Sequence, residues 1–368
     1  MGRSMWVVAA AAAIGCAVPP EVPDGVWGVR TLPTKSGWTV RWAGGGSATV
    51  DGERRLGDGL LEVDGARAHR VAVGDQVFAL PPRSTSPCGD VRFAVLGDGR
   101  AAVDGVGPSA YWPGILAEAL AVEPDFVLNT GDLVKNGHDR REWDAFLRTL
   151  PPWPPVISVR GNHDRGPHFE SLGLSPKEVF SWRVGPLLIV GFDSEAGASE
   201  RLAAVDAALA APAPWKILLM HRPVWSRGNH GSDSLGLNAR LVPIIDQRGV
   251  DLVFSGHDHH YERFCPSRGH GPLRRCTAAG EGTIYVVTGG AATFTNPVPG
   301  VSRAVPPAVA AADAAGSQVF SGAHHFVAVD ATPTALVVSA RRTRTGNLRP
   351  AGELDRFSLL RSAPECRR

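Results

Sequence analysis

Five apolar segments of this chain each end abruptly in polar side chains that can bind metal ions. The plainest is VISVRGNHD at 156–164, where an apolar run of strand type stops at Gly161 and is followed by Asn162, His163 and Asp164. Buried strands of α/β proteins carry such runs, and their carboxyl ends open into the crevice where these folds place their sites. The segment therefore predicts one edge of an active site.

The other four segments repeat this design. Two of them, VRFAVLGDGR at 91–100 and FVLNTGDLV at 126–134, reach Gly-Asp, while WKILLMHRP at 215–223 and DLVFSGHDHHYER at 251–263 reach histidines. Strand ends of this kind bring oxygen and nitrogen ligands to one edge of a sheet, and such a mixed set suits a pair of divalent first-row metals. The six candidate ligands are Asp98, Asp132, Asn162, His221, His257 and His259.

The order and spacing of these segments resemble those of the calcineurin-like metallophosphoesterase superfamily, and within it the purple acid phosphatases look nearest. The resemblance covers about residues 91–290. It implies an α/β fold, a four-layer αββα metallophosphoesterase sandwich; strand and helix periodicity alone would only indicate α/β. The motifs that carry it are GDG at 97–99, GDL at 131–133, GNHD at 161–164, LLMHRPVWS at 218–226 and GHDHHYER at 256–263.

The same resemblance assigns the candidate ligands to two metal positions. Asp132 would bridge both ions, Asp98 and His259 would complete the first position, and the remaining three ligands would form the second. One or two divalent or trivalent ions (Fe, Mn or Zn) are therefore expected. Two metals about 3.5–4 Å apart lower the pKa of a shared water and clamp a phosphoryl group, and hydrolysis of a phosphate ester requires both effects.

Two further histidines are candidates for catalytic roles. In the family, the histidine at the position of His163 interacts with substrate or stabilises the leaving group, and Asp164 could fix the tautomer of that ring. Similar purple acid phosphatases place a phosphate-contacting histidine where this chain has His230. The alternative for both residues is an ordinary histidine in a surface loop.

The chain departs from the family at the first metal position. Most of the superfamily has histidine two residues after the first Asp, where this chain has Arg100, and purple acid phosphatases have a tyrosine ligand where it has Lys135. Neither substitute binds a metal well, because guanidinium has no acceptor and lysine is normally protonated. We expect weak metal affinity there, no tyrosinate-to-iron colour, and Arg100 as a bidentate clamp on substrate phosphate. The alternative for Arg100 is a salt bridge to a nearby aspartate.

Two hypotheses for the function follow. The first is hydrolysis of small phosphomonoesters or phosphodiesters by a metal-activated hydroxide. Within it, the alternative is a diesterase or nucleotidase specialised by a Pro- and Ala-rich exposed loop at 297–317. The second is a degenerate relative that binds phosphate or a partner with little turnover. No G-x-S-x-G, Walker-type or H-E-x-x-H motif offers a competing site. A net charge of +2, from 38 basic and 36 acidic residues, indicates no nucleic-acid partner.

The chain before these segments has a different pattern. Residues 21–82 alternate in short stretches broken by Gly and Asp, which is typical of antiparallel strands and predicts a small all-β, sandwich-like domain. Purple acid phosphatases similarly carry a β-sandwich before the catalytic domain. Residues 83–90 would form a linker, and 91–368 the catalytic domain. Helices are expected within 108–122, 138–150, 199–211 and 235–249.

The first twenty residues, 1–20, have the build of an export signal. Arg3 precedes a ten-residue apolar run from Met5 to Ile14, which is too short to span a bilayer. The stretch that ends at Cys16 looks like a bacterial lipoprotein cleavage box, although Ala replaces the usual Leu three residues earlier. We expect export to the periplasm or cell envelope, with membrane attachment through a lipidated Cys16. The alternatives are ordinary signal cleavage nearby and a cytoplasmic protein with an Ala-rich leader.

The other four cysteines are an even number, which allows three disulfide pairings in an oxidising compartment. We favour Cys265 with Cys276, because that bridge would staple the loop leaving the last histidine segment. Cys88 with Cys366 would tie down the end of the chain. The alternative is that the thiols are buried and unbonded.

Overall fold

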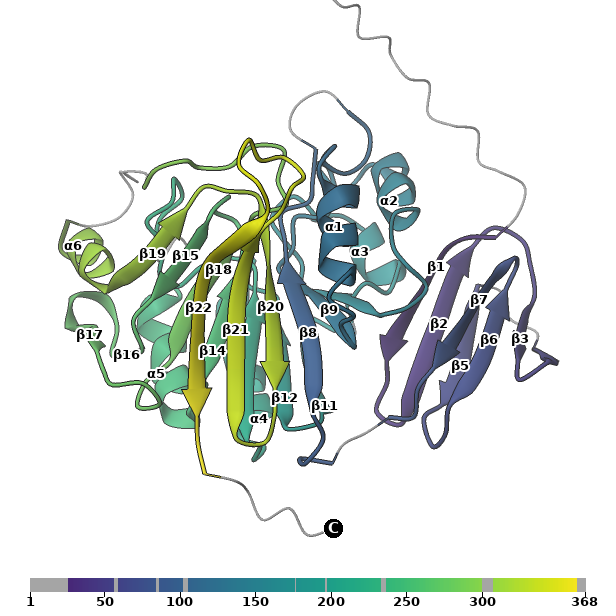
Figure 1. Cartoon of the computed structure of the whole chain (residues 1–368), viewed down its shortest axis with the longest axis horizontal. Helices are drawn as coiled ribbons and strands as arrows, with labels where there is room; N and C mark the ends of the chain where they lie inside the picture. Colours follow the sequence, from purple (N-terminus) through teal and green to yellow (C-terminus); the bar gives the residue numbers. More distant parts are fainter. Residues whose placement is uncertain are drawn as a thin grey trace, which may run out of the picture.

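The computed structural model describes residues 26–55, 59–83, 86–101, 105–175, 177–195, 197–232, 236–299 and 307–362. Two large sheets packed face to face form its centre, and smaller N-terminal sheets lie beside them (Figure 1). The predicted leader at 1–20, which includes Cys16, lies outside the described residues, and so does Cys366.

The first large sheet has six strands in the order β10-β9-β8-β20-β21-β22. Strands β8, β9 and β10 run parallel, and β20 pairs antiparallel with β8. The three parallel strands are buried almost throughout, as expected for strands covered on both faces. The strands are β8 (Val91–Leu96), β9 (Phe126–Asn129), β10 (Val156–Ser158), β20 (His325–Ala331), β21 (Ala335–Arg342) and β22 (Gly352–Leu360).

The second large sheet has seven strands in the order β11-β12-β13-β14-β18-β15-β19. Its centre, from β12 to β18, is parallel, and its edges are antiparallel. The strands are β11 (Val179–Val184), β12 (Leu187–Phe192), β13 (Trp215–Met220), β14 (Leu252–Ser255), β15 (Tyr261–Phe264), β18 (Ile284–Thr288) and β19 (Ser317–Ser321).

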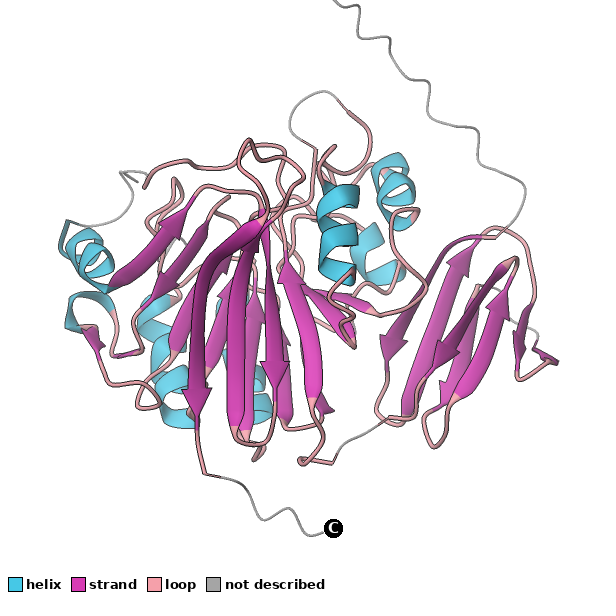
Figure 2. Cartoon of the chain, viewed as in Figure 1, coloured by secondary structure: helices cyan, strands magenta, loops and turns pink. Residues whose placement is uncertain are grey.

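Helices lie against part of the outer face of each sheet and complete four layers (Figure 2). Helices α1 (Trp112–Leu120), α2 (Arg140–Leu147) and α3 (His168–Ser171) share one hydrophobic cluster with the six-stranded sheet, and α4 (Ala198–Leu209) and α5 (Asn238–Arg248) share another with the seven-stranded sheet. A third cluster fills the space between the sheets, where burying each large side chain contributes about 1.5–3 kcal/mol. The predicted αββα sandwich is confirmed.

The N-terminal part is all-β, as predicted, and has its own hydrophobic cluster. Arg30 joins it to the large domain, because its guanidinium donates to the carbonyl of Leu172 at the end of α3. The domain boundaries proposed above remain predictions. The strands are β1 (Trp27–Pro33), β2 (Gly37–Ala43) and β5 (Leu60–Asp64) in one sheet, and β3 (Ala48–Val50), β4 (Glu53–Arg55), β6 (His69–Val73) and β7 (Gln76–Leu80) in another.

The expectation of a loop throughout 297–317 is wrong. Residues Pro307–Gly316 form helix α6, and its sequence PAVAAADAAG is rich in alanine, the best helix former. The four predicted helices are present as α1, α2, α4 and α5, each shorter than the predicted range. In the described part of the chain, no helix is long and apolar enough to cross a bilayer.

The predicted disulfide between Cys265 and Cys276 is confirmed, with the two Cα atoms 5.6 Å apart. It closes a loop that holds β16 (Ser267–Arg268), the 3₁₀ turn η1 (Gly271–Leu273) and β17 (Arg275–Cys276). Cys88 is also disulfide-bonded. The partner predicted for it, Cys366, lies outside the described residues.

Candidate metal centre

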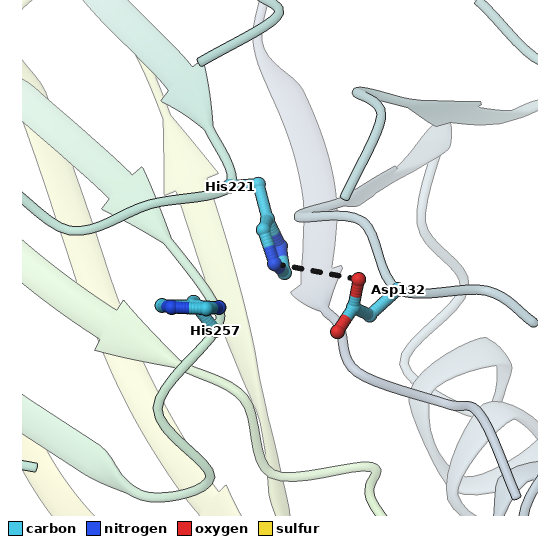
Figure 3. A group of neighbouring side chains, drawn as sticks. All are labelled: Asp132, His221 and His257. Atoms are coloured by element: carbon cyan, nitrogen blue, oxygen red, sulfur yellow. Dashed lines mark ion pairs between the residues drawn. The ribbon is translucent and has the colours of Figure 1, made fainter. Parts of the chain in front are cut away.

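The loops after five strands converge at one edge of the two large sheets. Those after β8, β9 and β10 carry candidate ligands from the six-stranded sheet, and those after β13 and β14 carry histidines from the seven-stranded sheet. Figure 3 shows Asp132 and His221 facing each other, with His257 beside them. All three side chains are buried, and their ligand atoms lie within 4.8 Å of one another. The strand-end pattern thus brings ligands from both sheets to a common point.

The backbone at three candidate ligands is left-handed. Asp98, Asp132 and His257 have φ angles of 63°, 55° and 70°. Non-glycine residues rarely adopt this conformation, which costs about 1–3 kcal/mol and is concentrated at functional sites. The sharp turn after each strand therefore directs the side chain into the centre. The conformational cost of the turn is offset by the stability of the surrounding fold.

Glycines next to the ligands allow the loops to pack this closely. A Cβ atom at Gly161 would lie 2.2 Å from Oδ1 of Asp132, and one at Gly256 would lie 2.3 Å from Oδ2 of Asp98. Real Cβ atoms do not approach other atoms so closely. These two positions require glycine because ligand carboxylates rest against their backbones.

Backbone carbonyls fix the tautomers of two histidines. Nδ1 of His221 lies 2.8 Å from the carbonyl oxygen of Thr130, and Nδ1 of His259 lies 3.1 Å from that of Phe294. A carbonyl only accepts, so each Nδ1 carries the hydrogen, and Nε2 is the nitrogen that can bind a metal. This is the usual arrangement of an imidazole that binds a metal.

The Nε2 atoms of both histidines face oxygen ligands. In His221, Nε2 lies 3.1 Å from Oδ1 of Asn162 and 3.4 Å from Oδ1 of Asp132. In His259, Nε2 lies 3.6 Å from Oδ1 of Asp98. One carboxylate, one amide oxygen and the imidazoles of His221 and His257 make a donor set that fits a divalent first-row ion such as Zn, Mn or Fe.

Burial and neighbouring charges shift the pKa values of the candidate ligands. Burial raises the pKa of Asp98 well above its usual range. Burial acts the same way on Asp132, but the nearby His221 and His163 hold the pKa of Asp132 below its usual value. Burial lowers the pKa of His259 to about 4, so this imidazole is neutral near pH 7 and can bind a metal.

Asp164 does not contact the ring of His163, so the expectation that it fixes that tautomer is wrong. Its carboxylate instead accepts hydrogen bonds from backbone N–H groups on both ligand loops. Nδ1 of His163 lies 2.8 Å from the carbonyl of Lys135, which sets the tautomer. The donors to Asp164 are the backbone nitrogens of Asp132, Leu133, Val134 and Gly161, at 2.8–3.2 Å.

The two candidate catalytic histidines both lie next to ligands. The backbone N–H of His163 donates to Oδ1 of Asp132 at 2.9 Å. The ring of His230 lies against that of His257, with centroids 4.0 Å apart. The backbone N–H of His230 donates to the buried carboxylate of Asp258 at 2.9 Å, so Asp258 holds the His230 loop in place.

Arg100 contacts a carboxylate of the centre. Its Nε lies 3.3 Å from Oδ2 of Asp132, and its Nη1 donates to the carbonyl of Ala101 at 3.3 Å. The contact corresponds to the salt bridge that the sequence left open as the alternative. All nine predicted site residues therefore lie at this one edge of the sheets.

Sequence reasoning missed a charged group beside the second metal position. Nη1 of Arg222 lies 3.0 Å from Nε2 of His257, and Nε of Arg222 donates to Glu195 at 2.9 Å. Glu195 also pairs with Arg165 at 2.9 Å. Two signals were available: Arg222 directly follows a candidate ligand, and Glu195 follows the polar end of the segment LLIVGFD.

Comparisons with known proteins agree with this architecture. The family model for calcineurin-like phosphoesterases matches residues 91–261. Purple acid phosphatase 22 of Arabidopsis thaliana is 28% identical over 218 residues, which cover 51% of this chain and 47% of that protein. Purple acid phosphatase 17 of the same plant is 31% identical over 228 residues, 50% of this chain and 66% of that protein. The chain thus covers less than two thirds of the length of either relative.

A solved structure extends the similarity of the fold. The purple acid phosphatase PPD1 from yellow lupin (Lupinus luteus) seeds superposes with a TM-score of 0.68 at 18% identity. The match covers 92% of this chain and 74% of that one. At this level of identity, the superposition establishes the shared fold.

Proposed function

Because the chain belongs to the calcineurin-like phosphoesterase superfamily, we propose that it hydrolyses small phosphate esters with the help of a bound metal ion. The main support is that buried ligand atoms from both sheets converge on one point. The ion would be held by Asp132, Asn162, His221 and His257. Iron, manganese and zinc all suit this mixture of oxygen and nitrogen ligands.

The residues of the chain would divide the chemistry between them. A bound ion supplies a water of lowered pKa and an electrophilic contact for a phosphoryl oxygen. The carbonyl of Thr130, which holds Nδ1 of His221, would leave Nε2 of that ring available to bind the ion. His163 holds its Nδ1 hydrogen on the Lys135 carbonyl, so its Nε2 is the atom that would take up a proton and deliver it to the leaving oxygen. His230, beside His257, would contact the phosphate.

A second candidate function is favoured by one observation, the contact between Arg100 and Asp132. The Arg100 guanidinium stands at the first metal position, so the two-metal site expected from the family is incomplete. A degenerate relative of this kind would bind phosphate or a partner protein and turn over little substrate.

Assays of the purified protein with chromogenic aryl phosphates test the proposal. Mono- and diester substrates, each supplied with Mn, Zn or Fe, should show metal-dependent turnover in at least one combination. Asp132→Asn and His221→Ala should each lower kcat/KM by more than about 100-fold, because even residues that only orient metal ligands cost 10–100-fold. His138→Ala, at an exposed loop histidine, is the matched control and should retain activity.

Two results would count against hydrolysis. The first is no turnover with any metal and either class of ester, together with retained binding of inorganic phosphate, which would favour the degenerate relative. The second is turnover that the Asp132 and His221 variants leave intact, which would place the activity elsewhere.

We also propose that the protein is exported and remains at the cell envelope, attached through a lipidated Cys16. The support is the leader sequence, and disulfide bonding at Cys265 and Cys276 agrees with an oxidising compartment. Recovery of the chain in the cytoplasmic fraction with an uncleaved N-terminus would contradict this proposal.

A further inference from the structure

The candidate first metal position has fewer protein donors than the second. Its protein donors would be Asp98, Asp132 and His259, and the two sequence positions where related proteins have a further ligand hold Arg100 and Lys135, which are poor metal ligands. Asp98 and His259 are not part of the group whose ligand atoms lie within 4.8 Å of one another.

The carboxylates at the first position already have hydrogen-bond donors. Both oxygens of Asp98 accept from the backbone N–H of His257, at 3.0 and 3.1 Å. Oδ1 of Asp132 accepts from the backbone N–H of His163, and Oδ2 faces Nε of Arg100 at 3.3 Å. Each of these donors takes up one lone pair of the oxygen that it contacts.

Two buried carboxylates assigned to one metal position need a positive charge nearby, because burying an uncompensated charge is costly. Asp98 is fully buried and Asp132 is 1% exposed. The Arg100 guanidinium is 14% exposed, and its Nε lies 3.3 Å from Oδ2 of Asp132. A guanidinium stays charged throughout the accessible pH range, so this compensation is permanent.

Backbone contacts hold Arg100 beside Asp132. Its N–H donates to the carbonyl of Asp132 at 3.1 Å, and a bridge pairs it with Pro108. On the side chain, Nη1 is held by the carbonyl of Ala101. These contacts hold the guanidinium against the ligand that would otherwise bridge two metals.

We propose that Arg100 takes the place of the first metal ion, so that the centre combines one metal with one fixed guanidinium. This inference rests on the metal centre of the proposed function and goes beyond it by assigning a stoichiometry. The guanidinium supplies positive charge for a phosphate but no coordination position for a water. Any activated water would therefore belong to the single ion held by His221 and His257.

Metal stoichiometry tests the proposal without measuring activity. The full chain is loaded with Mn or Zn, passed through a desalting column and analysed by plasma mass spectrometry. The wild-type protein should hold one ion per chain. Arg100→His, which supplies an imidazole where most of the superfamily has one, should hold two. Arg341→His, at an exposed arginine on β21, is the matched control and should hold one.

Electron paramagnetic resonance of the manganese-loaded proteins gives a second readout. An isolated Mn²⁺ ion in the wild-type protein should show a six-line spectrum, and Arg100→His should show the altered spectrum of two exchange-coupled ions. Arg100→Leu, which removes the cation without adding a ligand, should resemble the wild type in stoichiometry.

The outcomes separate this inference from the proposed function. Two ions in the wild-type protein overturn the inference and leave hydrolysis intact. One ion without turnover overturns hydrolysis and leaves the inference intact. No bound ion overturns both. A folded Arg100→His variant that still holds one ion also overturns the inference, and if that variant does not fold, the wild-type count decides.

Discussion

Asp164, next to the candidate catalytic residue His163, holds two ligand loops of the centre together. Its two carboxylate oxygens accept four backbone hydrogen bonds, three from the loop after β9 and one from Gly161 after β10. The side chain is fully buried, so these N–H groups have no access to water. Asp164 therefore locks the loop that carries Asp132 against the loop that carries Asn162.

We predict that Asp164→Asn destabilises the protein by about 2–4 kcal/mol. The amide keeps one accepting oxygen, and its NH₂ group faces backbone donors, so buried N–H groups lose their partner at about 1–3 kcal/mol each. Urea unfolding of both proteins measures the difference. The matched control is Asp144→Asn, which removes only an exposed ion pair with Arg140 and should cost less than about 1 kcal/mol. Equal losses in the two variants would contradict this role.

At the scale of elements, the turn between β3 and β4 contains an aspartate whose pKa is lowered. Asp51 has a φ of 54°, and its carboxylate accepts from the backbone N–H of Arg70 and contacts Nδ1 of His69 at 2.9 Å each. These hydrogen bonds lower the pKa of Asp51 to about 2. The turn is thereby tied to β6.

We predict that Asp51 stabilises the N-terminal sheets in a pH-dependent way. Its folded-state pKa lies below the ordinary value of about 3.9, so the stabilisation is complete above about pH 5 and is lost as pH falls toward 2. Asp51→Asn, which tolerates positive φ, should lower the melting temperature most near pH 6, and the difference from the wild type should shrink by pH 3. Asp75→Asn, at the exposed β6–β7 turn, is the matched control. If the difference in melting temperature between Asp51→Asn and the wild type did not change with pH, ionisation of Asp51 would not be the source of the stabilisation.

At the scale of the whole molecule, the centre joins the two large sheets. Asp132 and Asn162 follow strands of the six-stranded sheet, whereas His221 and His257 follow strands of the seven-stranded sheet. An ion bound to all four would link the two halves of the sandwich. The unfolded chain does not hold these ligands together, so binding of an ion would add to folding stability.

We predict that saturating Mn or Zn stabilises the whole protein. At a metal concentration 100 times the Kd, the free energy of unfolding should rise by about 2.7 kcal/mol and return to its starting value with a chelator. Thermal unfolding with and without metal measures the change. His221→Ala should abolish the response, and His138→Ala should keep it. A metal-induced shift that survives His221→Ala would show that the ion binds elsewhere.

The sequence identified the candidate ligands because each stands at the end of an apolar run. It did not identify the partners that hold them. The carbonyl that orients His221 belongs to Thr130, 91 residues away, and the one that orients His163 belongs to Lys135. Helix α6 was missed because its run of small residues has no helical apolar periodicity, although alanine favours helix.

By itself, the sequence determined the strands, their polar ends and the family, because hydrophobic periodicity and motif spacing are local properties of the chain. Only the tertiary structure decided how the ends meet: that Asp164 clamps two loops, that Arg222 contacts His257, and that Arg100 lies against Asp132. Those contacts join residues far apart in sequence, and they depend on how the two sheets pack, which no local pattern encodes.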